Sequence, residues 1–272
     1  MLPSIAPIGI FDSGLGGLSV LRHVRTQLPH EDLLYFADTA FAPYGGRNEA
    51  EIAARTLAVT AFLIAQGAKA LVIACNTATA AAIGAVRAHH PHLPIVGVEP
   101  GLKPAAALSR RRIVGVLATE STVASTRFTR LQSRVSADSG VTFLARGCAG
   151  LADQVEKGEL HSPATARLVY SYVKPLLEQG ADTLVLGCTH YPFLRPLIEQ
   201  ACAEQCAYPV PIIDTGDAVA RQLSRVLAQQ GLLHKTGCGT LAGYTTGSAA
   251  TLATGMKRLL GIEAPVRAID SA

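Results

Sequence analysis

The chain has 272 residues, of which 49% are hydrophobic and 16% are charged, and its formal net charge at pH 7 is +4. This composition provides the apolar side chains for a sizeable core, in one large domain or two ordinary ones, and excludes an intrinsically disordered chain. The small charge argues against nucleic acid as a partner, and the short triplet Arg110-Arg111-Arg112 is interpreted as a solvated boundary.

The sequence begins without the basic region and long apolar core of a signal peptide, and it has no apolar run long enough to span a bilayer. We therefore expect a cytoplasmic protein with no membrane partner. Six cysteines in a chain of this length do not suggest a disulfide framework. In a reducing compartment they are expected to be free, catalytic or metal-bound.

The first predicted strand is Ile8-Gly9-Ile10-Phe11, which runs into the glycine-rich segment Asp12-Ser13-Gly14-Leu15-Gly16-Gly17. Glycines directly after a strand let the backbone approach a ligand, and the amino end of the following helix, predicted at about 18–27, favours an anion such as a carboxylate or a phosphate. Asp12 would repel that anion unless it handles a proton or binds an ammonium group. The alternative interpretation of Asp12 is a helix cap.

A second strand is predicted at Leu33-Leu34-Tyr35-Phe36, and the run Pro43-Tyr44-Gly45-Gly46-Arg47 after it has the composition of a turn. The turn carries a polar aromatic side chain and a cation. The spacing of apolar residues then predicts a helix over 49–66 that stops at Gly67.

Two matched segments, Leu71-Val72-Ile73-Ala74-Cys75-Asn76-Thr77 and Leu184-Val185-Leu186-Gly187-Cys188-Thr189-His190, each lead from an apolar run to a cysteine. In both, the cysteine lies eight residues after the start of a Gly-Ala pair. The apolar runs predict strands buried on both faces, each with a thiol at its carboxyl end and a helix after it, at 78–88 and 193–205. The amino end of a helix favours thiolate over thiol. The alternative is two small buried residues that only pack.

A strand at Ile95-Val96-Gly97-Val98 closes the first copy, and the pattern restarts at Arg112 with a strand to Thr119. Aligning 8–98 with 113–213 places Gly115 with Gly9, Ala118 with Asp12, and His190 with Thr77. The two halves are therefore predicted to share a scaffold but to differ in chemical groups.

The second half continues with a strand at about 141–145, a helical stretch that contains Glu156, a helix over 162–179 and a strand at 210–213. The tail has no counterpart in the repeat; it predicts a helix at 218–230, a strand and loop at 239–247 and a final helix at 249–260. We expect it to pack on the first half. The predicted fold is α/β, with two pseudo-symmetric flavodoxin-like lobes (1–98 plus 214–272, and 99–213), mostly parallel sheets, and the active site in the cleft between them.

Strand ends from two such lobes would bring Cys75 and Cys188 to opposite sides of one ligand. A pair of thiols suits removal of a proton from one face of a carbon and delivery to the other, which is a racemisation without a cofactor. Asp12 and His190 would each tune the neighbouring thiol. The groups expected to hold the charged parts of the substrate, together with backbone amides, are Ser13, Asn76, Thr77 and Thr189.

Four ordered motifs, Phe11–Gly17, Pro43-Tyr44-Gly45, Ala74–Ala78 and Gly187-Cys188-Thr189-His190-Tyr191-Pro192, closely resemble those of the bacterial glutamate racemases, and the resemblance covers nearly the whole chain. It implies a cofactor-independent isomerase that interconverts L- and D-glutamate and supplies D-glutamate for peptidoglycan, and hence for the cell wall and cell shape. It also implies that Cys75 takes the proton from the D-enantiomer and that Cys188 takes it from the L-enantiomer.

The resemblance further implies that three residues assist the thiols: Asp12, Glu156 and His190. The positions that match substrate-contacting residues are Asp12-Ser13, Pro43, Tyr44-Gly45, Asn76-Thr77, Thr119, Thr122 and Thr189-His190. Two departures from the family pattern stand out. Ala149 follows Cys148 where the family often has proline, which makes the role of Glu156 less direct to transfer, and Glu120-Ser121 between the two threonines is unusual.

Three alternatives remain open: a sister enzyme such as an aspartate or hydantoin racemase, a binding or regulatory protein with a degenerate site, and a thiol–disulfide protein. The intact pair of cysteines argues against degeneracy, and the lack of a Cys-x-x-Cys pair argues against the last. The expected small-molecule partner is glutamate. The resemblance also implies a homodimer, and it leaves open a second role such as the gyrase inhibition reported for some glutamate racemases.

No metal site is predicted. The run His89-His90-Pro91-His92 lacks acidic partners, and Cys202 and Cys206, one helical turn apart, have no further ligands nearby in the sequence.

Overall fold

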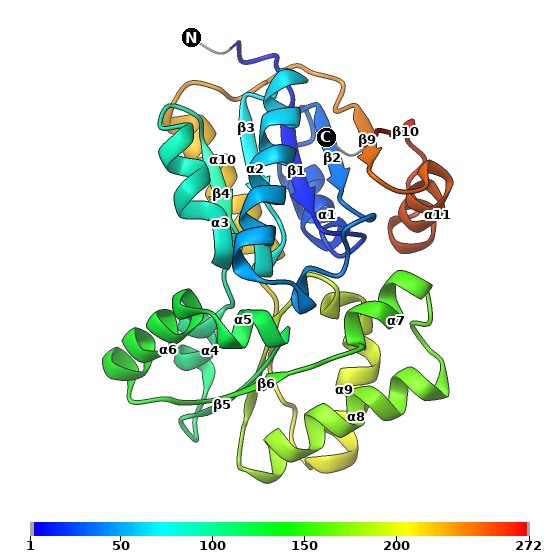
Figure 1. Ribbon diagram of the computed structural model, residues 1–272. Helices are drawn as coiled ribbons and strands as arrows, with labels where there is room; N and C mark the ends of the chain where they lie inside the picture. The colour runs from blue at the N-terminus through cyan, green and yellow to red at the C-terminus, as the bar shows by residue number, and fades with distance from the viewer. Residues whose placement is uncertain (1–2, 271–272) are drawn as a thin grey trace. The chain divides into compact units, whose positions relative to one another are not determined.

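The computed structural model describes residues 3–270, which fold into two compact units. The first unit comprises the described residues up to Val98 together with those from Gly216 onward, and the second runs from Glu99 to Thr215. Figure 1 traces the chain through both. None of the helices within 3–270 is long and apolar enough to cross a membrane.

The first unit is built on a six-stranded sheet in the order β10-β9-β2-β1-β3-β4, with every neighbouring pair parallel. Within this unit, α2 and α3 pack together over one face of the sheet, and α1 and α10 pack together over the other (Figure 1). The tail joins this unit because β9 pairs with β2. The strands are β1 (Ile8–Asp12), β2 (Leu33–Ala37), β3 (Ala70–Ile73), β4 (Ile95–Gly97), β9 (Leu241–Thr245) and β10 (Val266–Ala268). The helices are α1 (Leu18–Gln27), η1 (Tyr44–Gly46), α2 (Glu49–Ala65), α3 (Asn76–His89), α10 (Gly216–Gln229) and α11 (Ala249–Leu260).

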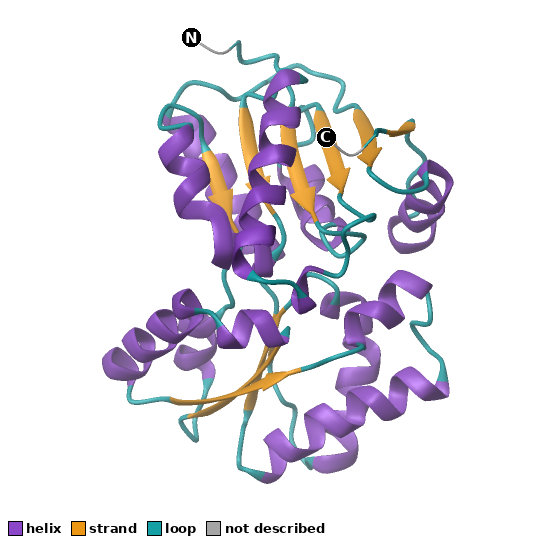
Figure 2. Cartoon of the chain, in the orientation of Figure 1, coloured by secondary structure: helices purple, strands orange, loops and turns teal. Residues whose placement is uncertain are grey.

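The second unit is built on a four-stranded parallel sheet in the order β6-β5-β7-β8. Its strands, drawn in orange in Figure 2, lie between helices on both sides. The strands are β5 (Ile113–Ala118), β6 (Thr142–Gly147), β7 (Thr183–Gly187) and β8 (Ile212–Ile213). The helices are α4 (Leu102–Leu108), α5 (Glu120–Ala124), α6 (Thr126–Ser139), α7 (Leu151–Lys157), α8 (Pro163–Glu178), η2 (Tyr191–Leu194) and α9 (Arg195–Gln205).

Side chains of β7 alternate between two cores, as expected for a strand covered on both faces. Leu184 and Leu186 pack in a cluster with α7, α8 and α9, whereas Val185 packs in a cluster with α4 and α6. All residues of β3 and β7 are buried, which confirms the prediction of doubly covered strands before each cysteine.

The predicted duplication is visible in the strand order, because β2-β1-β3-β4 and β6-β5-β7-β8 are the same arrangement, the flavodoxin-like one. It extends to atomic packing. A Cβ on Gly9 would lie 2.8 Å from Leu71 Cδ2, and a Cβ on Gly115 would lie 2.7 Å from Leu184 Cδ2. In each unit, a side chain at the matched glycine would therefore force a buried leucine to move.

Several elements differ from the sequence-based expectations. The structure adds α4, α5, α6 and β10, which the sequence reading left unassigned. The helix expected over 193–205 begins only at Arg195, after the 3-10 turn η2 that contains Pro192. The helix expected over 78–88 begins earlier, at Asn76, directly after Cys75.

Candidate active site

The first strand-end thiol, Cys75, caps the amino end of α3. Its Sγ accepts the backbone N–H of Ala78 at 3.4 Å, and its side chain is 5% exposed. The thiol also lies 3.8 Å from Ser13 Oγ, as donor to that hydroxyl. A helix N–H and the helix dipole both favour a negative charge on sulfur, so this position suits a thiolate.

Asp12 ends β1, the strand that neighbours β3, and is completely buried. Its Oδ2 accepts the N–H of Gly14 at 2.9 Å. A Cβ on Gly17 would lie only 2.5 Å from Asp12 Cβ, so glycine is needed where α1 begins. The cap of α1 is Gly17, so the interpretation of Asp12 as that helix's cap is wrong. Asp12, Ser13 and Cys75 instead gather at the carboxyl ends of β1 and β3, where this fold class binds ligands.

The first turn of α3 adds Asn76 and Thr77, both buried. Within the described part of the chain, the Asn76 Nδ2 atom is buried and has no hydrogen-bond partner. A buried amide donor without a partner is costly to a fold. Beside a helix amino end, it is a ready donor for a ligand oxygen.

The Tyr44 hydroxyl makes a hydrogen bond inside the protein. It donates to Asp38 Oδ2 at 2.5 Å, and the side chain is 1% exposed. Burial and the neighbouring Asp38 carboxylate raise the pKa of Tyr44, so it stays a neutral donor. Of the two residues beside it, Pro43 is exposed and Gly45 is half-buried.

The Asp38 carboxylate anchors this turn, and the sequence analysis did not single it out. The buried carboxylate also accepts hydrogen bonds from Arg55, at 2.9 and 3.1 Å, and from the Thr246 hydroxyl at 2.9 Å. Arg55 in turn stacks over the Phe41 ring, 3.8 Å from its centroid. The Pro43-Tyr44-Gly45 turn is thus fixed to α2 and to the end of β9.

The second strand-end thiol, Cys188, has different surroundings. The chain after it forms a turn and then η2, so no α-helix begins at this residue. Its Sγ lies 3.6 Å from His190 Nδ1, and His190 Nε2 lies 2.7 Å from Glu156 Oε1. Thr189, between them, is buried. The structure therefore brings Glu156 to His190 although Ala149 stands where proline is usual.

The surroundings of His190 favour its protonated form. Burial opposes its protonation, but the hydrogen bonds to Cys188 and Glu156 outweigh burial and raise the pKa of His190 well above the ordinary value of 6.5. A protonated His190 would place a positive charge 3.6 Å from the Cys188 sulfur, whereas the Cys75 sulfur faces the amino end of α3.

Thr119 and Thr122 follow β5 and bond to one another. The Thr119 hydroxyl donates to Thr122 Oγ1 at 2.8 Å and accepts the Thr122 N–H at 3.2 Å, so it caps the short helix α5. This pair stands at the end of β5, the counterpart of the strand that carries Asp12.

Two further points concern the cysteines and metals. The six cysteines all fall within the described residues, and none is in a disulfide. Among residues 3–270, no group of three or more His, Cys, Asp or Glu side chains is arranged to hold a metal ion.

Comparison with known proteins bears on these features. The model of the Asp/Glu/Hydantoin racemase family matches residues 8–223. A curated glutamate racemase from Ectopseudomonas mendocina is 48% identical over 266 residues, covering 98% of this chain and 99% of that protein. The crystal structure of glutamate racemase isoform RacE1 from Bacillus anthracis superposes with a TM-score of 0.88 at 32% identity, over 97% of each chain.

A further similar structure is the glutamate racemase from Francisella tularensis, determined in complex with D-glutamate, with a TM-score of 0.85 and 27% identity over 98% of each chain. The similarities span nearly the full length of this chain. The chain therefore belongs to the glutamate racemase family of isomerases, within the wider group of Asp/Glu/hydantoin racemases.

Proposed function

We propose that this protein interconverts L- and D-glutamate by two-base proton transfer at the α-carbon, with Cys75 and Cys188 as the bases and without a cofactor. The observation that carries the proposal is that each unit has a buried thiol at the carboxyl end of a central parallel strand, with a group beside it that stabilises the thiolate. The relatives named above act on glutamate or have been determined with it bound.

In the proposed reaction, one thiolate removes the α-proton and the opposite thiol delivers a proton to the other face of the carbon. Cys75 acts as the base toward D-glutamate, and Cys188 acts as the base toward L-glutamate. After a turnover the two sulfurs have exchanged protonation states, so the reverse reaction starts from the enzyme form that the forward reaction leaves. No electron is gained or lost in this cycle.

The neighbouring groups have separate roles in this proposal. His190, held protonated by Glu156, stabilises the Cys188 thiolate, and the amino end of α3 stabilises the Cys75 thiolate. Asp12 handles a proton or the substrate ammonium group. The Asn76 amide, with the Thr77, Thr189 and Ser13 hydroxyls, holds the carboxylates, and Thr119 and Thr122 add to that site. D-Glutamate made in this way would supply peptidoglycan synthesis.

The test follows the α-hydrogen of L-glutamate, D-glutamate and L-aspartate by NMR in deuterated water, together with optical rotation and with no cofactor added. We expect both glutamate enantiomers to exchange and racemise while aspartate stays inert. An enzyme that exchanges aspartate faster than glutamate would instead be a sister racemase, and one silent toward all three would be a binding protein.

Two variants test the assignment of the bases. Cys75→Ser and Cys188→Ser should each lower racemisation by about a thousandfold, since a serine hydroxyl is too weak an acid to replace a thiol in proton transfer. Cys202→Ser is the matched control, because Cys202 is equally buried but lies within α9 and away from the strand ends. Near-normal rates in either of the first two variants would sink the two-base mechanism.

A further inference from the structure

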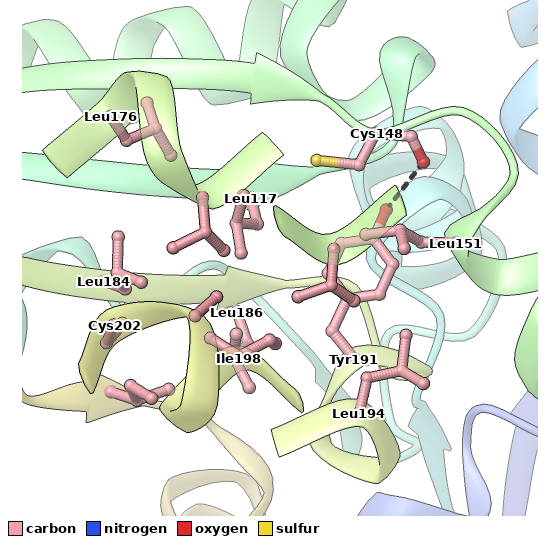
Figure 3. Close-up of a cluster of buried hydrophobic side chains, with 14 of the residues drawn as sticks. Leu117, Cys148, Leu151, Leu176, Leu184, Leu186, Tyr191, Leu194, Ile198 and Cys202 are labelled. Atoms are coloured by element: carbon pink, nitrogen blue, oxygen red, sulfur yellow. Dashed lines mark hydrogen bonds between the residues drawn. The ribbon is translucent and has the colours of Figure 1, made fainter. Parts of the chain in front are cut away.

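Tyr191, the residue after His190, is completely buried and is not assigned any part in the site described above. It opens η2, and its backbone N–H donates to the Cys188 carbonyl at 3.2 Å, which closes the turn that holds Cys188, Thr189 and His190. Its ring lies in the same apolar cluster as Cys148, Leu151 and Leu194, as Figure 3 shows.

The Tyr191 hydroxyl lies between two backbone carbonyls at neighbouring strand ends. It is 3.3 Å from the carbonyl oxygen of Ala118, the last residue of β5, and 3.3 Å from that of Cys148, directly after β6. Figure 3 draws the second of these contacts. The Ala118 carbonyl also accepts the Cys148 N–H at 2.8 Å. The Tyr191 hydroxyl therefore contacts two strand ends that are hydrogen-bonded to each other.

These contacts link the two halves of the His190–Glu156 pair. His190 precedes Tyr191 on the turn, and Glu156 is on α7, which begins at Leu151, three residues after Cys148. Leu151 and Val155 of α7 are fully buried in the cluster that contains the Tyr191 ring. The hydroxyl therefore ties the turn that carries Cys188 and His190 to the segment from which α7 starts.

We propose that Tyr191 is a positioning residue for the Cys188 side of the reaction: its hydroxyl fixes the turn against the ends of β5 and β6, and so holds His190 between Cys188 and Glu156. This inference rests on the proposed function, because it assigns Tyr191 to the step in which Cys188 exchanges a proton with L-glutamate. The hydroxyl acts through His190 and does not touch the reacting atoms. Burial raises the pKa of Tyr191 far above its ordinary value, so the group remains a donor throughout the working range.

The test is Tyr191→Phe, which keeps the buried ring and removes only the hydroxyl. The variant loses the hydrogen bond that the Tyr191 hydroxyl shares between the Ala118 and Cys148 carbonyls. This loss should lower kcat/KM for glutamate by about three- to tenfold. The deciding readout is the primary isotope effect on kcat/KM with α-deuterated substrates. If Cys188 alone is misplaced, its step becomes more rate-limiting, so the isotope effect should rise with L-glutamate and fall with D-glutamate.

Tyr172→Phe is the matched control, because the Tyr172 hydroxyl donates to the carbonyl of Ala149, the residue after Cys148, but its side chain is only half-buried and this bond goes to neither of the carbonyls that the Tyr191 hydroxyl contacts. It should leave both isotope effects at the values of the unchanged enzyme. Equal changes of the two isotope effects in Tyr191→Phe, or no change, would overturn the positioning role.

A second measurement does not depend on turnover. The imidazole signals of His190, titrated by NMR in the unchanged protein and in Tyr191→Phe, should show a lower pKa in the variant, and near-UV circular dichroism should show an intact fold. An unshifted titration contradicts the proposal. If the unchanged protein neither exchanges nor racemises glutamate, it is the proposed function that fails, and the titration still reports on the position of His190.

Discussion

The two proposed catalytic cysteines have physically different groups beside their sulfur atoms. Cys75 accepts a backbone N–H at the start of a 14-residue helix, and this charge arrangement does not titrate. Cys188 depends on the His190 imidazole, which is charged only while it is protonated. The rate of proton transfer at Cys188 should therefore depend more strongly on pH than the rate at Cys75.

Glu156→Gln tests this dependence. Glu156 helps to raise the pKa of His190, so its neutralisation should lower that pKa toward the ordinary value. Since His190 is the cation below its pKa, the alkaline limb of the kcat/KM–pH profile should move to lower pH. The control is Glu159→Gln, an exposed acid just beyond α7. If the alkaline limb does not move in Glu156→Gln, the charge of His190 does not control the reactivity of Cys188.

Tyr44→Phe tests whether the Tyr44 hydroxyl stabilises the fold through its hydrogen bond to Asp38. The variant removes one donor from the buried Asp38 carboxylate, which should lower the free energy of unfolding by about 2 kcal/mol, the usual size for a hydrogen bond to a charged group. Urea denaturation followed by circular dichroism measures this change. The KM for glutamate should change little once folding is complete. A large rise in KM without a loss of stability would show instead that the hydroxyl contacts the substrate.

At the scale of single elements, local patterns predicted the strands and most helices because their apolar runs are long and their ends are marked. The helix α6 escaped because its apolar positions are few, Phe128, Leu131 and Val135, in an otherwise polar segment. Its cap signals were present: the Ser125 side chain accepts the Phe128 N–H, and Gly140 ends the helix at a φ of 68°.

In the candidate site, the positions of the two cysteines could be predicted from local sequence, but the contacts between distant residues could not. Cys75 and Cys188 follow buried strands, so sequence alone placed them at strand ends. The contact of Glu156 with His190 arises between residues 34 positions apart, through the packing of α7 on η2, and no local pattern specifies it. The convergence of Tyr44, Arg55 and Thr246 on Asp38 is also tertiary, which is why Asp38 was missed.

The matched glycines of β1 and β5 make a prediction about the duplicated scaffold. Gly9→Ala and Gly115→Ala should each lower the free energy of unfolding by about 1–3 kcal/mol, because the new methyl group meets a buried leucine at under 3 Å. Gly84→Ala is the control, since nothing lies within 4 Å of a Cβ there and alanine favours the helix α3. Urea denaturation of the three variants gives the comparison. A loss of unfolding free energy in Gly9→Ala without one in Gly115→Ala would contradict equivalent packing of the two units.

At the scale of the whole molecule, each unit has its own core and its own polar anchors. In the first unit, Lys69 and Glu31 form an ion pair at 2.5 Å with both side chains almost fully buried. Glu31 also accepts the N–H of His234, and the Lys69 ammonium group donates to the Ser4 carbonyl. This pair thus joins the start of the chain, the approach to β3 and the loop before β9.

Lys69→Met should therefore destabilise the first unit by about 3–5 kcal/mol, since it leaves a buried carboxylate without its partner. Hydrogen exchange measured peptide by peptide should show faster exchange in β1, β3 and β9. The double variant Lys69→Met with Glu31→Gln should recover part of the loss, because it removes the unpaired charge. Faster exchange confined to β5–β8 would contradict this assignment.

The unlike surroundings of Cys75 and Cys188 have a consequence for the energetics of the proposed reaction. Mirror-image amino acids have the same free energy in achiral solution, so their equilibrium constant is fixed and kcat/KM must be equal in the two directions. Loss of the His190 charge at high pH weakens only one of the thiols directly, yet detailed balance spreads the loss over both substrates. With unlabelled substrates, a chemical asymmetry between the bases can therefore appear in kcat and in KM taken separately, where the two enantiomers are free to differ, but not in their ratio.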